Sequence, residues 1–165
     1  MEQKVKDYIK EVLSEKRPEF GGRATCPFAL PELESGRLMI GEVQGEQGLS
    51  QLIDKFHESN YDSALLTIED DIPAHQTDQF ETFVDKLLRF KGMEQFKSIC
   101  FNPNDPVSVD GFNPRSMSPC FMINIARREV LYKANRLMYK TNYYDKLSDE
   151  YLSFLRLEGR GKDAK

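Results

Sequence analysis

The strongest constraint on the fold is a regular alternation of strand-like and helix-like segments in the middle of the chain. Short apolar runs have the length of buried strands, and the segments between them carry apolar residues at the three- and four-residue spacing of an amphipathic helix. In chain order the segments are 37–43, 48–59, 61–69, a helix around Phe80–Leu88, and 95–101. This order predicts right-handed crossover connections and a sheet that contains parallel neighbours.

The helix around Phe80–Leu88 has the clearest pattern of these segments. We expect Asp78 and Glu81 to form a capping box at its start and Gly92 to end it. Its apolar stripe is predicted to comprise Phe80, Phe83, Val84, Leu87 and Leu88.

Further elements extend the pattern to both ends of the chain. A helix is predicted over Val5–Leu13, a strand over 120–126, a helix over 130–138, and a last helix that begins at a Ser148 cap. A chain of 165 residues is of a size that one core can organise. The predicted fold is one α/β domain over residues 1–158, a sandwich in which helices flank a mixed sheet of about four strands. Residues 159–165 are predicted to form a disordered tail.

Charge and composition exclude several classes of function. The net charge of −4 gives no general attraction to phosphate backbones or anionic membranes, so we expect neither nucleic acid nor a membrane as partner. The N-terminus lacks the apolar run of a signal peptide, which predicts a soluble cytoplasmic protein with reduced thiols. The three cysteines and two histidines show no metal-ligand spacing, so no metal site is predicted, and the sequence specifies no cofactor.

Cys26 is the first candidate for chemistry because it lies in a connection, between Thr25 and Pro27, rather than inside an apolar run. A guanidinium such as that of Arg23 would favour the nucleophilic thiolate. Cys26 would then be catalytic, with Arg23 and Thr25 binding substrate and His57 or His75 as the base. In the alternative interpretation, residues 26–30 form an apolar plug at one end of the sheet, because free cysteine is usually buried.

The second candidate is a proline-rich loop, residues 102–119. Its Asn-Pro pairs fix an extended or turn backbone, which would hold polar side chains in place for a ligand. Arginine binds carboxylates and phosphates through its two-pronged guanidinium, and Arg127 would join the loop's arginine if the strands on either side of the loop are neighbours. The predicted substrate-binding residues of this region are Asn102, Asn113, Arg115, Ser116 and Arg127. Alternatively, the loop is only a crossover stiffened by proline.

Two short motifs resemble a group of uncharacterised bacterial domains of unknown function. The motifs are "CPFA" at 26–29 and, more loosely, "FNPRSMSPCFMINIARRE" at 112–129, and the similarity would span most of residues 5–135. The resemblance implies a shared α/β fold and a common site formed by the Cys-Pro-Phe segment and the proline-rich loop. It implies no reaction. Where the group carries His-Pro, this chain has Asn102-Pro103, and asparagine does not titrate usefully.

These features lead to two hypotheses. In the first, the chain is a small metabolic or biosynthetic enzyme that binds a small anionic molecule between residues 21–30 and the 102–119 loop. In the second, it is a non-catalytic accessory or binding protein, and the tyrosine-rich segment 137–155 forms a partner or homodimer interface, since tyrosine combines apolar area with a polar tip.

Overall fold

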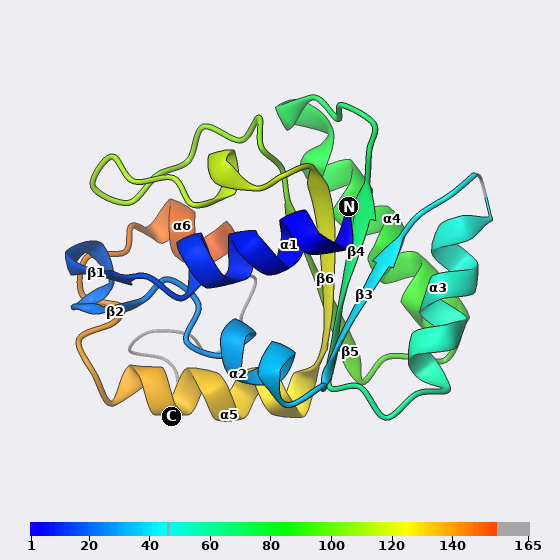
Figure 1. Ribbon diagram of the computed structural model, residues 1–165, viewed down its shortest axis with the longest axis horizontal. Coiled ribbons are helices and arrows are strands. Elements are labelled where there is room, and N and C mark those ends of the chain that lie inside the picture. Colours follow the sequence, from blue (N-terminus) through cyan, green and yellow to red (C-terminus); the bar gives the residue numbers. More distant parts are fainter. Residues whose placement is uncertain (46, 155–165) are drawn as a thin grey trace.

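A four-stranded mixed sheet forms the centre of the molecule (Figure 1). The computed structural model describes residues 1–45 and 47–154. The strands lie in the order β3 (Leu38–Glu42), β4 (Ser63–Ile68), β6 (Phe121–Arg127) and β5 (Phe96–Phe101). β3 and β4 are parallel, whereas β6 is antiparallel to both β4 and β5. The predicted mixed α/β sheet flanked by helices is therefore confirmed.

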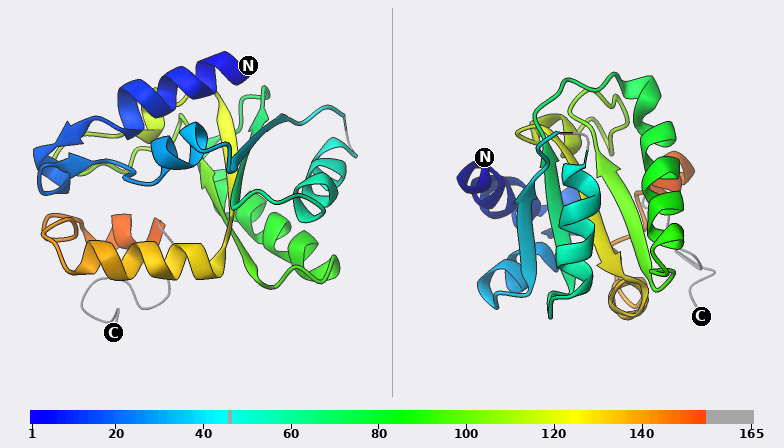
Figure 2. Two further views of the ribbon diagram at one scale, coloured as in Figure 1. Left: turned by 60° about the horizontal axis from the view of Figure 1, so that its bottom comes forward. Right: turned by 90° about the vertical axis from the view of Figure 1, so that its right-hand side faces the viewer.

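Two helices cover one face of this sheet. They are α3 (Gly48–His57) and α4 (Thr77–Phe90), which lie together in front of the strands in the right-hand view of Figure 2. Every second residue of β4 points to this side, and all six β4 residues are buried because both faces are covered. The core here contains Ile53, Phe56, Leu66, Val84, Leu88 and Ile123.

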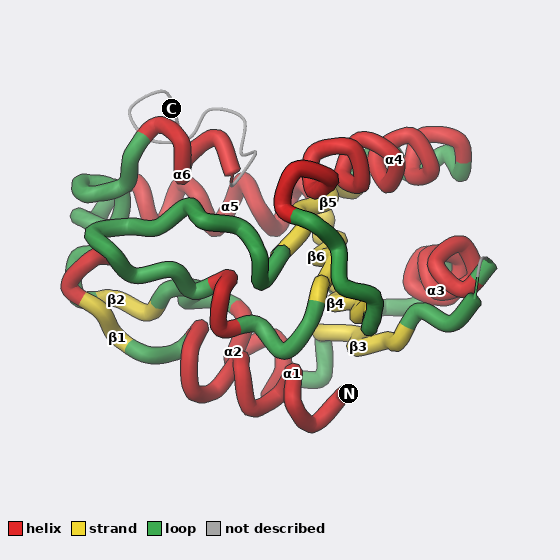
Figure 3. The backbone as a smooth tube through the Cα atoms, turned by 90° about the horizontal axis from the view of Figure 1, so that it is seen from above, coloured by secondary structure: helices red, strands yellow, loops and turns green. Residues whose placement is uncertain are grey.

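The opposite face is covered by the N-terminal helices and by α5 (Arg128–Tyr139), as Figure 3 shows from above. α1 (Glu2–Tyr8) continues directly into a π-helical turn (Ile9–Leu13), and α2 (Ala29–Glu34) follows after an irregular segment. The five residues that predicted the first helix are all buried: Val5, Tyr8, Ile9, Val12 and Leu13. They pack against Leu65 and Met122 of the sheet.

A small hairpin and the last helix form a third packing unit beside this layer. The hairpin pairs β1 (Lys16–Arg17) with β2 (Arg23–Ala24) around a 3₁₀ turn (Pro18–Phe20). Phe20 packs with residues of the 102–119 loop and of the segment that leads into α6 (Asp149–Phe154). The Ser148 hydroxyl accepts the Tyr151 N–H at 3.1 Å, so the predicted helix cap is confirmed.

The start of α4 differs from the prediction. A 3₁₀ turn (Ala74–Gln76) leads into the helix, and no side chain caps its N-terminus. The predicted capping box is wrong, because the buried Glu81 carboxylate accepts the N–H of Cys100 in β5 at 2.7 Å. The predicted stripe is wrong at Phe83, which is 54% exposed.

The structure does not describe residue 46 or residues 155–165, so the predicted tail lies outside the described residues. Among those that are described, no helix has both the length and the apolar character needed to cross a membrane.

Candidate functional site

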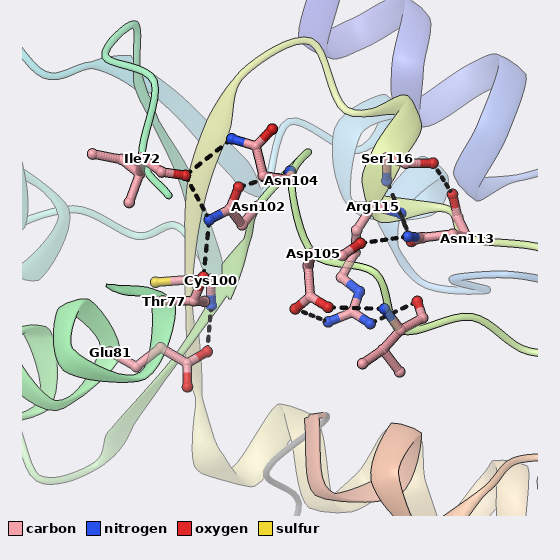
Figure 4. A network of polar contacts seen from close by, with 11 residues as sticks. Ile72, Thr77, Glu81, Cys100, Asn102, Asn104, Asp105, Asn113, Arg115 and Ser116 are labelled. Atoms are coloured by element: carbon pink, nitrogen blue, oxygen red, sulfur yellow. Dashed lines mark hydrogen bonds and ion pairs between the residues drawn. The ribbon is translucent and has the colours of Figure 1, made fainter. Parts of the chain in front are cut away.

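Arg115 anchors the proline-rich loop from inside (Figure 4). Its side chain is 1% exposed, and its Nη1 lies 2.6 Å from Oδ2 of Asp105. Its Nη2 donates a hydrogen bond to the Val107 carbonyl at 2.9 Å. The guanidinium therefore connects the later part of the loop to Asp105 and Val107 in its earlier part. A planar group with several N–H donors is suited to such a role.

The loop's asparagines also make hydrogen bonds within the fold. Asn113 Oδ1 accepts the backbone N–H of Arg115 at 3.0 Å and that of Ser116 at 3.3 Å, while its Nδ2 donates to the Asp105 carbonyl at 2.6 Å. The Ser116 hydroxyl donates to the Asn113 carbonyl at 2.8 Å. These polar groups, predicted to orient a substrate, thus stabilise the loop.

Asn102 plays the same role at the other end of the loop. It is fully buried, and its Nδ2 donates to the Ile72 carbonyl and to Thr77 Oγ1, both at 2.9 Å. Its Oδ1 accepts the Asn104 N–H at 2.9 Å. Asn102 therefore ties the end of β5 to the start of α4 (Figure 4).

The other predicted binding residues are spread over the molecule. Arg127 ends β6, whereas Arg115 precedes it, so the two arginines lie at opposite ends of a seven-residue strand. The prediction that Arg127 joins Arg115 is therefore wrong, although β5 and β6 are neighbours as assumed. The Arg127 guanidinium lies 4.9 Å from the centre of the Phe96 ring. Arg23 is exposed in β2, and Thr25 is buried with its carbonyl accepting the Tyr143 hydroxyl.

Cys26 lies between β2 and α2, where its backbone N–H donates to the Leu13 carbonyl at 2.8 Å. It packs against the core layer under α1 and lines a pocket of about 110 Å³ between α2, the sheet and α5. The apolar walls include Phe28, Leu65, Met122, Ala126, Val130 and Ala134. Three further polar residues, Glu32, Ser63 and Asn124, also line it.

The environment of Cys26 favours the neutral thiol. Burial raises its pKa above the ordinary value of 9.0, and the backbone N–H groups of Phe28 and Ala29 offset this only in part. The thiolate that a neighbouring guanidinium was expected to favour is therefore the minor form at neutral pH.

Alkylation of Cys26 should report this raised pKa. We expect iodoacetamide to modify native Cys26 more slowly than N-acetylcysteine at about pH 7, and the rate to keep rising beyond pH 9.0, because only the thiolate reacts. Peptide mapping by mass spectrometry measures the rate at each cysteine. Cys100, which is buried, should react only on unfolding and serves as the internal control. A rate for Cys26 that levels off below about pH 8 would contradict the account.

Glu32 has the second perturbed group of the pocket. Burial raises the pKa of its carboxyl, while a hydrogen bond donated by the Ser63 hydroxyl acts in the opposite direction. The ionised form is therefore less favourable in the folded chain than in the unfolded one.

A pH titration of stability should detect this shift. Because the folded-state pKa of Glu32 is raised, its protonated form stabilises the fold fully below the ordinary pKa of 4.5, and this contribution is lost as the pH rises through the folded-state pKa. We expect the Glu32→Gln variant to gain stability relative to the wild type as the pH rises from 4.5 through the folded-state pKa of Glu32. Urea unfolding at a series of pH values measures it, and a gap between the two proteins that does not change with pH would refute it.

Arg115 lines a different cavity, of about 520 Å³, together with Asp105, Thr77 and Glu81. Tyr8 links the two regions: its hydroxyl donates to the Pro114 carbonyl at 2.8 Å, and its side chain belongs to the core cluster against which Cys26 packs. The Cys-Pro-Phe segment and the proline-rich loop therefore approach one another; of the two cavities, Cys26 lines the pocket of about 110 Å³ and Arg115 lines the cavity of about 520 Å³.

Sequence reasoning missed three residues of the Cys26 pocket, namely Glu32, Ser63 and Asn124. Ser63 and Asn124 are polar residues in otherwise apolar strands, a signal that could have marked them. The histidines proposed as bases lie elsewhere: His57 is the exposed last residue of α3, with its ring edge-on to that of Phe96, and His75 is exposed before α4. Within the described residues, no three His, Cys, Asp or Glu side chains are grouped so as to hold a metal ion.

We compared the chain with protein families, curated proteins and solved structures. No protein-family model matches the chain, and no curated protein or solved structure is significantly similar to it.

Proposed function

We propose that this chain is a small-molecule-binding protein whose ligand occupies the Cys26 pocket. The observation that carries the proposal is the composition of that pocket, in which apolar walls surround a thiol, a carboxyl, a hydroxyl and an amide. Ligand sites are typically concave, mostly apolar and supplied with a few convergent polar groups. The perturbed pKa values of Cys26 and Glu32 add to this, because such shifts concentrate at functional sites.

The sequence predicted an anionic ligand bound by arginine side chains, whereas the ligand proposed here is bound mainly by apolar contacts. None of Arg23, Arg115 and Arg127 lines the Cys26 pocket, so the body of the ligand contacts mainly hydrocarbon. A catalytic role for Cys26 requires its thiol to lose a proton, and Glu32 is an acceptor in the same pocket. The Cys26→Ser variant tests this catalytic role. It should still bind the ligand but form no covalent adduct with it.

Filling the pocket should abolish binding. In the Ala134→Leu variant, three added carbons enter the space beside Cys26, whereas Arg136→Leu places the same side chain at an exposed position of α5. Methyl-detected NMR with isopentanol, a small uncharged apolar probe, measures occupancy. We expect shifts at Leu65, Met122 and Val130 in the wild type and in Arg136→Leu, and their loss in Ala134→Leu. Unchanged spectra in all three proteins would remove the proposal.

A protein interface is the second candidate function, and exposed aromatic residues favour it. Tyr143 and Tyr151 are buried within the chain, so among residues 137–152, whose side chains the structure describes, Leu137 and Tyr139 are the large exposed hydrophobic residues available to a homodimer. On α4, Phe90 is 90% exposed and Phe83 lies two turns away on the same side. Size-exclusion chromatography over a range of concentrations tests this candidate, and a strictly monomeric protein counts against a homodimer. Membership of the bacterial Cys-Pro-Phe group and a cytoplasmic location stay predictions.

A further inference from the structure

A second cavity adjoins the Cys26 pocket. It has a volume of about 200 Å³ and shares four wall residues with the pocket: Phe28, Glu32, Val130 and Ala134. It lies between α2 and α5, towards exposed side chains such as Lys133 and Leu137. We call the two spaces the inner chamber, which contains Cys26, and the outer chamber.

Four charged residues line the outer chamber, two of each sign. Glu32 and Asp62 carry the negative charges, and Arg37 and Lys133 carry the positive charges. Arg37 Nη1 lies 3.1 Å from Asp62 Oδ2, and Glu32 is hydrogen-bonded by Ser63 at the boundary with the inner chamber. A simple anion bound here would be repelled by the two carboxylates, and a simple cation would be repelled by the two positively charged side chains. A group that carries both signs is complementary to this arrangement.

The inner chamber limits the size of the apolar body that such a charged group can carry. An engineered apolar cavity of about 150 Å³ accommodates benzene, so a chamber of about 110 Å³ accommodates a somewhat smaller body. An aliphatic chain of about four heavy atoms meets this limit. Its walls are formed mainly by hydrocarbon, as such a chain requires.

We infer that the two chambers together bind a free α-amino acid with an apolar aliphatic side chain. The side chain lies in the inner chamber beside Cys26. The ammonium group faces Glu32 and Asp62, and the carboxylate faces Arg37 and Lys133. This inference rests on the proposed function, since it names the class of ligand for the same pocket.

Titration with matched ligands tests the inference. L-leucine carries both charges, N-acetyl-L-leucinamide has the same side chain and neither charge, and isopentanol carries the same four-carbon isobutyl body on an uncharged CH₂OH group. We expect L-leucine to bind at least about tenfold more tightly than N-acetyl-L-leucinamide, because charged hydrogen bonds in a half-buried site contribute most of the difference. Methyl-detected NMR gives both the affinity and the chamber that each probe enters.

Variants of the outer chamber assign the two charges. Glu32→Gln should weaken L-leucine binding about tenfold, and Lys133→Gln, at an exposed position, about two- to fivefold. Arg136→Gln on the same helix should leave it unchanged, and neither Lys133→Gln nor Arg136→Gln should alter the affinity for isopentanol. Equal affinity for L-leucine and N-acetyl-L-leucinamide would overturn the inference.

The outcomes separate this inference from the proposed function. If isopentanol shifts the methyl signals of the inner chamber and L-leucine does not, the assignment to amino acids fails while the proposed pocket stands. If neither probe shifts those signals, both fail.

Discussion

Replacing Arg115 by methionine is expected to lower the free energy of unfolding by about 3–5 kcal/mol. The side chain is almost fully buried, and its guanidinium neutralises Asp105, whose side chain is 16% exposed. Methionine keeps most of the volume but leaves this carboxylate without its cation and the Val107 carbonyl without a donor. The cost arises from those two groups, since a buried charge that loses its partner retains its full desolvation penalty.

Urea unfolding of the variant and of two controls measures this effect. Arg115→Lys keeps the charge but not the two-pronged geometry, so its loss should fall between those of the wild type and the methionine variant. Arg127→Met removes an arginine that lies over the Phe96 ring at the edge of the sheet, and it should cost no more than about 1 kcal/mol. An Arg115→Met variant as stable as Arg127→Met would contradict the anchoring role.

Replacing Phe20 by alanine should have an effect of similar size, a loss of about 3–5 kcal/mol. The ring is fully buried, and its centre lies 5.4 Å from that of Tyr143, 6.0 Å from that of Tyr151 and 6.3 Å from that of Phe112. It therefore connects the β1–β2 hairpin to the loop and to the segment that leads into α6. Alanine removes all three contacts and leaves a cavity where the hairpin, the loop and this segment meet.

Hydrogen exchange gives this prediction a local measurement. Backbone amides from Tyr143 to Tyr151 should lose protection in the Phe20→Ala variant more than those of β4 do, because the segment loses a fully buried packing partner. Phe83→Ala removes the same ring from a 54% exposed position, and it should change the free energy of unfolding by about 0.5 kcal/mol or less. If the two variants were equally stable, the packing role of Phe20 would be refuted.

The sequence was most informative where a pattern repeats along an element. Residues 61–69 and 120–126 were predicted as strands because continuous apolar runs are typical of strands covered on both faces, and β4 and β6 are such strands. The β1–β2 hairpin was missed because two-residue strands are too short to show a period. The short α2 was missed because it contains Pro31, although proline is tolerated in the first turn of a helix.

The candidate site was harder to predict because it depends on contacts between distant segments. The position of Cys26 outside any apolar run did indicate a residue at the edge of the core. Glu32, Ser63 and Asn124 reach the same pocket from α2, β4 and β6, and only the packing of α2 against the sheet brings them together. The polar loop residues had the composition of a binding loop, but Asn102 and Asn113 serve to fix its backbone. Sequence composition alone does not distinguish these two uses of asparagine.

A crystal structure of the protein soaked with isopentanol tests the central claim most directly. We expect difference density for the isobutyl end of the probe in the inner chamber, in contact with Cys26, Leu65 and Ala134. Density confined to other sites, or an inner chamber filled by the protein's own side chains, would contradict it.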